Sequence, residues 1–518
     1  MPTGFERIVE LTVGLLFGVA LLTMAARRFR VPYPSLLVLG GVALSFIPHV
    51  PQATLPPELV LLVFLPPLIF SAGWETSWRD LSRNGLNLAS LAVGLVLATT
   101  LGVGAVLHLV VRTIPWGACF TLGAIVSPTD PIAVNAIASK LPLPHRLVTL
   151  LESESLANDA TGLVVYRFAV AAVLGGTFSA GHAALAMVGV SLGGALLGLA
   201  VGWLASAAMA RIDDARVEIA LQLVTAYAAY LPAEKLGLSG VFAAAVAGLW
   251  VGRRSSSVMG SRSRLQASAF WNTLVYLING VLFLLLGLQI HALLSTQAWD
   301  VGRVIAACAA VIGTTVALRF VWIFAFSSRV NGQALDSRLR AVMGWAGMRG
   351  VLSVATALAL PLTLPSGLPF PDRELIALVA FAVVIVTLVG QGLSLPALIG
   401  RLGISGPDGL DAEAAAARMI ALRAAVSRIA ELTEGAEGAR ATAGAELQRR
   451  LAAAISRVAP GPFATDSPRD LDAAFSFLQR ELIDAERTTL LELWRAGKLD
   501  DHSLRRIERD LDLQELRL

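Results

Sequence analysis

Carboxylates interrupt two long apolar stretches of this chain. One stretch contains SPTDP at residues 127–131, and the other begins with ESESLAND at residues 152–159. An acidic side chain at membrane depth is energetically costly, so such residues mark ion pathways and proton relays. The acidic groups here stand beside hydroxyl and amide groups, and that combination indicates a cation site.

The first stretch is predicted to contain a broken helix. Pro128 and Pro131 each remove a backbone donor and disfavour helical conformation in the residue before them. The helix must therefore open near Thr129 and Asp130, and transporters bind their substrates at such breaks near the membrane midplane. We expect Asp130 to lie at the positive end of the second half-helix, which favours its ionised form.

The second stretch supplies four polar residues on adjoining faces of one helix. Side chains four residues apart share a helical face, so Ser155 stacks with Asp159 and, on the next face, Glu154 stacks with Asn158. Hydroxyl, amide and carboxylate oxygens suit a hard cation, and a buried carboxylate can also take up a proton. Competition of cation and proton for Asp159 is the minimum that exchange requires.

Two arginines lie in later apolar stretches. A guanidinium group is not left unpaired in lipid, so Arg319 and Arg349 need partners. Glu154 suits either arginine, and its pairing would leave Asp159 to exchange ions. Three glycines surround Arg349, at positions 344, 347 and 350, and permit local unwinding. They predict a second broken helix, related to the first by an inverted repeat.

Composition identifies the class of protein. Of 518 residues, 56% are hydrophobic and only 15% are charged, whereas soluble domains carry about 25% charged residues. We therefore predict an all-α polytopic membrane protein. Apolar runs long enough to cross a bilayer predict about thirteen transmembrane helices, at 7–26, 33–49, 56–74, 86–111, 115–139, 147–174, 183–210, 217–233, 237–252, 268–294, 301–326, 340–363 and 374–400.

The distribution of basic residues predicts the orientation. Connections after odd-numbered spans hold seventeen Lys and Arg residues, against five on the opposite side. By the positive-inside rule the odd connections are cytoplasmic, so the N-terminus lies outside and the C-terminus inside the cell membrane. The basic character of the chain reflects this topology, and we expect no nucleic-acid partner. The first span reads as a transmembrane helix and not a cleaved signal peptide.

The chain is predicted to divide into two domains. Residues 1–402 form the transmembrane domain, and residues 403–518 form a soluble cytoplasmic tail that is rich in Ala, Glu and Arg. Helical stretches are predicted at 411–434, 437–458, 467–497 and 500–517. A regulatory ligand or partner of this tail is not readable from its residues. Neither the six histidines nor the two cysteines form a ligand pattern, so we expect no cofactor.

Three motifs together resemble the sodium/proton antiporters of the monovalent cation:proton antiporter-1 family, of the NhaP type. The resemblance covers about residues 1–402. Its motifs are Thr129-Asp130-Pro131, the Glu154-Ser155 and Asn158-Asp159 pairs of one helix, and Gly347 with Arg349-Gly350. One position departs from several relatives, in which a Glu follows a Pro-Pro-x-x-Phe stretch in the third span. Here Ser71 stands there, with Glu75 one turn later.

The resemblance implies both a fold and a set of residue roles. The fold is a thirteen-helix homodimer with two crossed broken helices and an elevator-like movement of the ion-binding bundle. An Asn-Asp pair, here Asn158 and Asp159, goes with electroneutral one-for-one exchange in such proteins. The implied roles are Na⁺ ligands for Thr129, Ser155 and Asp159, site organisers for Asp130 and Asn158, and a structural ion pair for Glu154 and Arg319.

The function expected from these residues is transport and not catalysis. We expect a secondary antiporter that exchanges Na⁺ for H⁺, with Li⁺ or K⁺ as alternative cations. An ion channel is a second hypothesis, although no selectivity-filter motif is visible. A third is an intramembrane aspartyl protease that uses Asp130 and Asp159, but the amide of Asn158 beside Asp159 argues against it.

Overall fold

The structure, a computed structural model, describes residues 4–29, 31–48, 60–83, 85–130, 143–175, 180–295, 300–326, 329–330, 333–404, 410–434, 439–458 and the single positions 486, 488 and 492. These residues form helices and one short antiparallel hairpin. Three π-helical turns (η1–η3) continue directly into α-helices.

Helices make up most of both halves of the chain. The first half contains α1 (Gly4–Phe29), α2 (Tyr33–Ser45), η1 (Val60–Phe64), α4 (Leu65–Glu75), α5 (Trp78–Arg83), α6 (Gly85–Ala89), η2 (Ser90–Leu95), α7 (Val96–Val110), α8 (Trp116–Ile125), α10 (His145–Val173), α11 (Ala180–Met209), α12 (Ala215–Lys235) and α13 (Gly240–Val258). The second half contains α14 (Ser261–Leu288), α15 (Ile290–Ser295), α16 (Val301–Phe326), β1 (Arg329–Val330), β2 (Gln333–Ala334), α17 (Ser337–Trp345), α18 (Val351–Leu358), α19 (Arg373–Ile385), η3 (Val386–Gln391), α20 (Gly392–Leu402), α21 (Leu410–Thr433) and α22 (Ala439–Val458).

The predicted spans agree with the helices in position, and the differences have local causes. Each of the thirteen predicted ranges contains helix among the described residues. The predicted range 340–363 ends too late, because α18 stops at Leu358 before Pro361 and Pro365. The predicted range 268–294 starts too late, because α14 already begins at Ser261.

The helices confirm an all-α, multi-pass membrane protein. In the described residues, seven helical stretches of 20 to 34 residues are long and apolar enough to cross a membrane. Shorter apolar helices accompany them, among them α2 and α8. A count of thirteen crossings stays a prediction.

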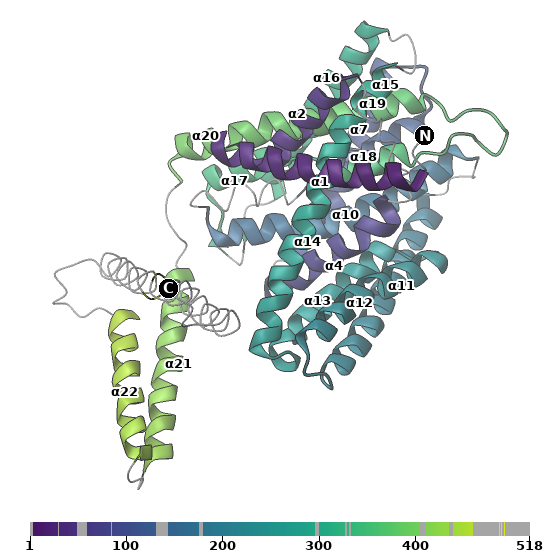
Figure 1. The fold of residues 1–518 in the computed structure, drawn as a ribbon. Coiled ribbons are helices and arrows are strands. Elements are labelled where there is room, and N and C mark those ends of the chain that lie inside the picture. Colours follow the sequence, from purple (N-terminus) through teal and green to yellow (C-terminus); the bar gives the residue numbers. More distant parts are fainter. Residues whose placement is uncertain are drawn as a thin grey trace. The chain divides into compact units, whose positions relative to one another are not determined.

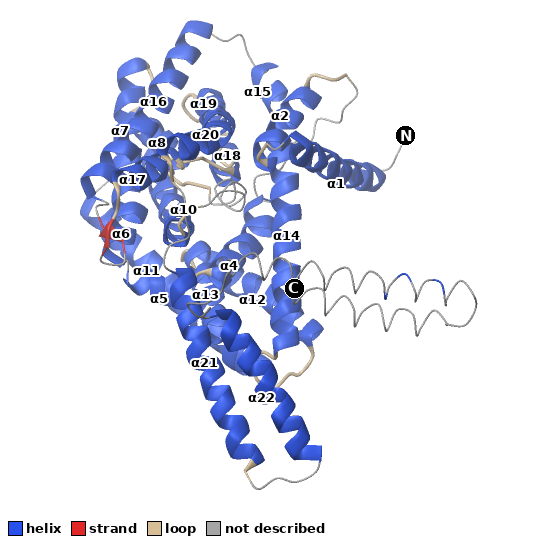
Figure 2. Cartoon of the chain, turned by 90° about the vertical axis from the view of Figure 1, so that its left-hand side faces the viewer, coloured by secondary structure: helices blue, strands red, loops and turns tan. Residues whose placement is uncertain are grey.

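Two groups of helices make up the membrane unit (Figure 1). In the first group, α4, α11, α12, α13 and α14 pack around Phe70 and Trp271, whose rings lie 5.3 Å apart. In the second group, α7, α8, α10, α16 and α19 pack around an apolar core that includes Leu122 and Val311. Residues of the first group, among them Ile69 and Ala244, also belong to this core. Figure 2 shows the interrupted helices α8, α17 and α18 beside α10.

The first group depends on close backbone contact between α4 and α13. Gly248 faces the carbonyl of Phe70, and Gly252 faces that of Trp74, so a Cβ at either glycine would come within 2.3 Å of a carbonyl oxygen. Such contacts allow helices to approach backbone to backbone. They join α4 and α13 tightly, so that these two helices form one structural unit.

We predict that Gly248→Ala destabilises the protein by about 1–3 kcal/mol, because the added Cβ must force α4 and α13 apart. The matched control is Gly313→Ala in α16, where a Cβ meets nothing within 4 Å. Thermal unfolding of the purified variants in detergent checks this expectation. An unchanged melting temperature for Gly248→Ala would contradict the backbone contact.

The C-terminal residues form a second unit, which begins at Pro407. Its described part contains α21 and α22, which contact each other through Gly444 and Thr433. The ion pairs in these helices are exposed. The pKa of Glu446 is lowered by a hydrogen bond from Arg450 and by the charge of Arg449. The helices predicted at 467–497 and 500–517 lie outside the described residues, apart from three positions.

Candidate functional site

Both predicted helix breaks are present in the structure. The first helix, α8, ends at Ile125, and residues 126–130 are not helical. In the second, α17 ends at Trp345, α18 starts at Val351, and the residues between them are not helical. The prolines and glycines at these positions account for the interruptions. The half-helix predicted to follow Asp130 lies outside the described residues.

The two breaks contact each other. The backbone N–H of Asp130 donates a 2.8 Å hydrogen bond to the carbonyl of Met348. The Asp130 side chain lies against Gly350, where a Cβ would come within 2.6 Å of the carboxylate. Gly350 directly precedes α18, so the Asp130 charge faces the positive end of that helix. The start of α18 is therefore a helix end that can stabilise the Asp130 charge, and the same role expected of the half-helix after Asp130 stays a prediction.

We predict that Gly350→Ala lowers exchange strongly, because its Cβ would displace the Asp130 carboxylate. Displacement of a site group by about 1 Å can cost roughly a hundredfold in rate. The control is Gly390→Ala in η3, where a Cβ has open space. Initial exchange rates in liposomes measure the effect. Equal rates for the two variants would show that the position of Asp130 does not matter.

A hydrogen-bond network joins the first break to α10. The Ser155 hydroxyl donates to the carbonyl of Thr129 at 2.5 Å. The Asn158 amide group donates to the Thr129 hydroxyl at 2.8 Å and accepts from the Thr129 backbone N–H at 3.3 Å. Asn158 therefore holds Thr129 in place, and it contributes no ionisable group to the site. Ser155 and Asn158 are both buried.

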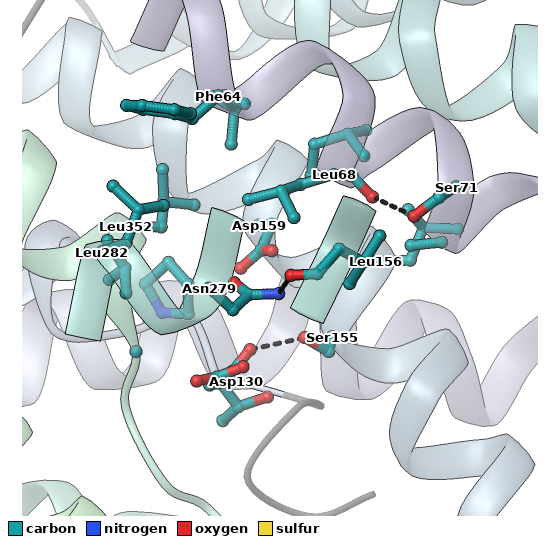
Figure 3. A pocket seen from close by; sticks show the side chains of 18 of the residues that line it. Phe64, Leu68, Ser71, Asp130, Ser155, Leu156, Asp159, Asn279, Leu282 and Leu352 are labelled. Atoms are coloured by element: carbon teal, nitrogen blue, oxygen red, sulfur yellow. Dashed lines mark hydrogen bonds between the residues drawn. The ribbon is translucent and has the colours of Figure 1, made fainter. Parts of the chain in front are cut away.

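A cavity of about 160 Å³ opens onto this network. Thr129, Asp130, Ser155 and Asp159 all line it, so the structure brings these predicted site residues together. Figure 3 shows the Asp159 carboxyl group facing the interior of the cavity. Oxygens of a carboxylate, a hydroxyl and a backbone carbonyl thus surround a space that can accommodate a dehydrated or partly hydrated cation.

Next to the cavity residues of α10, Glu154 forms an ion pair with Arg319. The guanidinium group donates to both carboxylate oxygens, at 2.5 and 3.1 Å, and its Nε donates to the carbonyl of Met343 at 3.2 Å. Both side chains are buried, with 2% of Arg319 and 0% of Glu154 exposed. The sequence left both arginines open as partners, and the structure assigns Arg319. The pair joins α10, α16 and α17.

Arg349 instead joins the two breaks. Its guanidinium group donates to the carbonyl of Ser127 in the first break. Its backbone N–H donates at 3.1 Å to the Thr387 hydroxyl, which lies in the π-helical turn η3. This buried cation therefore contacts the backbone that the proline break leaves without helical partners.

Two cavity residues were missed in the sequence. Asn279 of α14 and Ser353 of α18 line the cavity, and each is 1% exposed. The signal was an amide at Asn279 within an apolar helix, and a hydroxyl at Ser353 one turn after the glycine break.

Arg167, a further arginine of α10, forms an ion pair with Glu234 of α12. Glu234 also accepts a hydrogen bond from the backbone N–H of Gly240.

The third span contributes Ser71 and Glu75 to the cavity wall. The Ser71 hydroxyl donates to the carbonyl of Leu68 within its own helix at 3.1 Å. Glu75 lines the same cavity one turn later, at the end of α4. Glu75 and Asp159 therefore line the same cavity.

Comparison with known proteins gives a consistent result. The family model described as sodium/hydrogen exchanger, transmembrane, matches residues 14–400. The uncharacterized Na⁺/H⁺ exchanger Rv2287 of Mycobacterium tuberculosis is 38% identical over 414 residues, which are 76% of this chain and 74% of that protein. The Na⁺/H⁺ antiporter ApNhaP of Aphanothece halophytica is 34% identical over 406 residues, covering 77% and 75%.

A further relative and a solved structure extend the comparison. The sodium, potassium, lithium and rubidium/H⁺ antiporter of Bacillus pumilus is 32% identical over 419 residues, 77% of this chain and 62% of that protein. The sodium proton antiporter MjNhaP1 of Methanocaldococcus jannaschii has the same fold, with a TM-score of 0.62 at 19% identity over 75% of this chain and all of that one. The chain belongs to the sodium/hydrogen exchanger family of monovalent cation:proton antiporters.

Proposed function

We propose that this protein exchanges cytoplasmic Na⁺ for external H⁺, and that the two ions compete for Asp159. The observation that supports this proposal is the cavity beside the two breaks, which Asp159 lines together with Ser155 and Thr129. A carboxylate there binds either a cation or a proton, and each form is neutral. Thr129, Ser155 and Asp159 are the proposed Na⁺ ligands, with Asp130 and Asn158 as organisers of the site.

The proposed stoichiometry is one Na⁺ for one H⁺. Three features support it. Glu154 is neutralised by Arg319, and position 158 holds an amide that cannot change its charge. The proposal also takes the Asp130 carboxylate, which lies against Gly350 at the start of α18, to keep its charge through the cycle. Asp159 is then the group whose charge is cancelled alternately by Na⁺ and by H⁺, so that the exchange moves no net charge.

Alternating access is proposed to follow an elevator movement between the two groups of helices. The cavity lies at their boundary: α4 and α14 of the first group form one part of its wall, and α10, α18 and the first break form another. Movement of the second group against the first would expose Asp159 to each side in turn. The close contact of α4 with α13 supports a rigid first group.

Orientation and assembly are proposed from charge and family resemblance. The excess of Lys and Arg in the odd connections supports an outside N-terminus and a cytoplasmic C-terminus in the cell membrane. A homodimer is proposed from the resemblance. Roles in the homeostasis of pH and sodium would follow from the exchange reaction itself.

Transport by the full-length protein in liposomes tests the function. An imposed pH gradient is monitored while Na⁺, Li⁺ and K⁺ are added in turn, with and without a voltage clamp by K⁺ and valinomycin. We expect Na⁺ to collapse the gradient at a rate that the clamp does not change. If K⁺ is the effective cation, the related K⁺/H⁺ exchange replaces our assignment.

Two results in the same assay would contradict the proposal. A rate that changes with the clamped voltage would exclude one-for-one exchange. Cation flux that continues without proton movement would favour the channel hypothesis. If no cation moves protons at any pH, the assay is repeated with a variant that lacks the tail from about Gly403, which shows whether the tail inhibits exchange. If this variant also moves no protons, the antiport function is rejected.

A further inference from the structure

Two polar side chains in the cavity have no role in the site described above. Asn279 and Ser353 lie outside the three sequence motifs, on α14 and α18. Both are 1% exposed and both line the cavity that contains Asp159. A buried amide or hydroxyl is costly unless its polar atoms are satisfied. Their atoms therefore require a partner, either in the protein or in the ion that the cavity receives.

The orientation of the Asn279 amide group is set by its own helix. Its Nδ2 donates to the carbonyl of Val275 at 2.8 Å. Because a carbonyl only accepts, the nitrogen must lie on that side and Oδ1 on the other. Figure 3 shows this amide group pointing toward the carboxyl group of Asp159. Two acceptors that face each other repel unless a proton or a cation lies between them.

The helix break gives Ser353 an unused hydroxyl group. A helical serine or threonine usually donates to the carbonyl three or four residues earlier, as Thr356 does to Leu352 at 2.9 Å. For Ser353 those positions are Gly350 and Arg349, which precede α18 and are not helical. Among the described residues its Oγ has no hydrogen-bond partner. The break therefore leaves a buried hydroxyl oxygen in the cation cavity.

We propose that Asn279 Oδ1 and Ser353 Oγ are two further oxygen ligands of the transported cation. The inference rests on the proposed function, and it adds α14 and α18 to the elements that bind the ion. Neutral oxygens add coordination without adding charge, so they preserve a site that one Na⁺ neutralises. They also adjust the size of the coordination shell around the cation, and this size selects between cations of the same charge.

The test measures cation binding without transport. Na⁺ and Li⁺ are titrated against purified full-length protein, and the rise in melting temperature gives the half-saturating concentration. We expect Asn279→Ala and Ser353→Ala each to raise this concentration for Na⁺ about tenfold, the effect of losing one contact to a charged group. The Na⁺/Li⁺ ratio should change as well. A general loss of stability would not change that ratio.

Two variants control for packing. Ser353→Thr keeps the hydroxyl and should bind Na⁺ as the wild type does. Ser71→Ala removes a hydroxyl from the same cavity, but one that donates to Leu68 within its helix, and should leave binding unchanged. Wild-type binding in Asn279→Ala or in Ser353→Ala would remove that residue from the proposed shell, and wild-type binding in both would overturn the inference.

Failure of the inference is distinguishable from failure of the proposed function. Asp159→Asn, measured in the same titration, should lose the stabilisation by Na⁺. If wild type shows no stabilisation, or if Asp159→Asn retains it, the assignment of the cation site itself is wrong. If Asp159→Asn behaves as expected while both alanine variants bind normally, only the additional ligands are rejected.

Discussion

Asp159→Asn is expected to abolish exchange, with proton movement reduced to that of protein-free liposomes. The amide has nearly the shape of the carboxyl group but neither carries a charge nor binds a proton at ordinary pH. It therefore cannot bind the cation and the proton alternately. Because Asp159 has no part in the Glu154–Arg319 ion pair, the variant should fold and should melt close to the wild-type temperature.

The matched control removes a carboxylate that does not line the cavity. Asp214 caps α12 and accepts from the backbone N–H groups of Arg216 and Val217. Asparagine caps a helix as well as aspartate does, so Asp214→Asn should exchange at the wild-type rate. Normal exchange by Asp159→Asn, at equal protein content, would mean that another group carries the ions.

Glu154→Gln is expected to destabilise the protein by about 3–5 kcal/mol, because it leaves the buried Arg319 guanidinium without a countercharge. This cost is large because the side chains of Glu154 and Arg319 are only 0% and 2% exposed. Thermal unfolding in detergent measures it as a lower melting temperature. Gly347 packs against the Arg319 side chain, so little room remains for water to solvate the unpaired charge.

A second substitution tests the electrostatic cause. Replacing both partners, as in Glu154→Gln with Arg319→Met, removes the buried charge and should recover most of the lost stability. The exposed pair of Arg428 and Glu431 is the control, and Glu431→Gln should melt as the wild type does. If the double variant is no more stable than Glu154→Gln, the loss comes from packing and not from charge.

The sequence predicted the breaks because backbone chemistry is local. Pro128 and Pro131 could not continue a helix, and the structure confirms that α8 ends before them. The glycines around Arg349 likewise predicted the second interruption, which the structure confirms between α17 and α18. The positions of the helices followed from apolar runs that only a bilayer requires.

Features that depend on three-dimensional packing could not be predicted from the sequence. Arg319 and Arg349 have similar apolar surroundings in the sequence, and only the packing of α16 against α17 places Arg319 at Glu154. Asn279 lies more than a hundred residues from Asp159, and nothing in the spacing relates them. The start of α18 also faces Asp130, and the local sequence could not reveal this contact because α18 lies more than two hundred residues further along the chain.

The central claim is that Na⁺ and H⁺ compete for Asp159, and the pH dependence of exchange tests it most directly. The half-saturating Na⁺ concentration and the maximal rate are measured in liposomes across a series of pH values. In the acidic range, competition predicts a half-saturating concentration that rises about tenfold for each unit fall in pH, with an unchanged maximal rate. The opposite pattern would contradict a shared site: as the pH is lowered, the maximal rate falls while the half-saturating Na⁺ concentration stays constant.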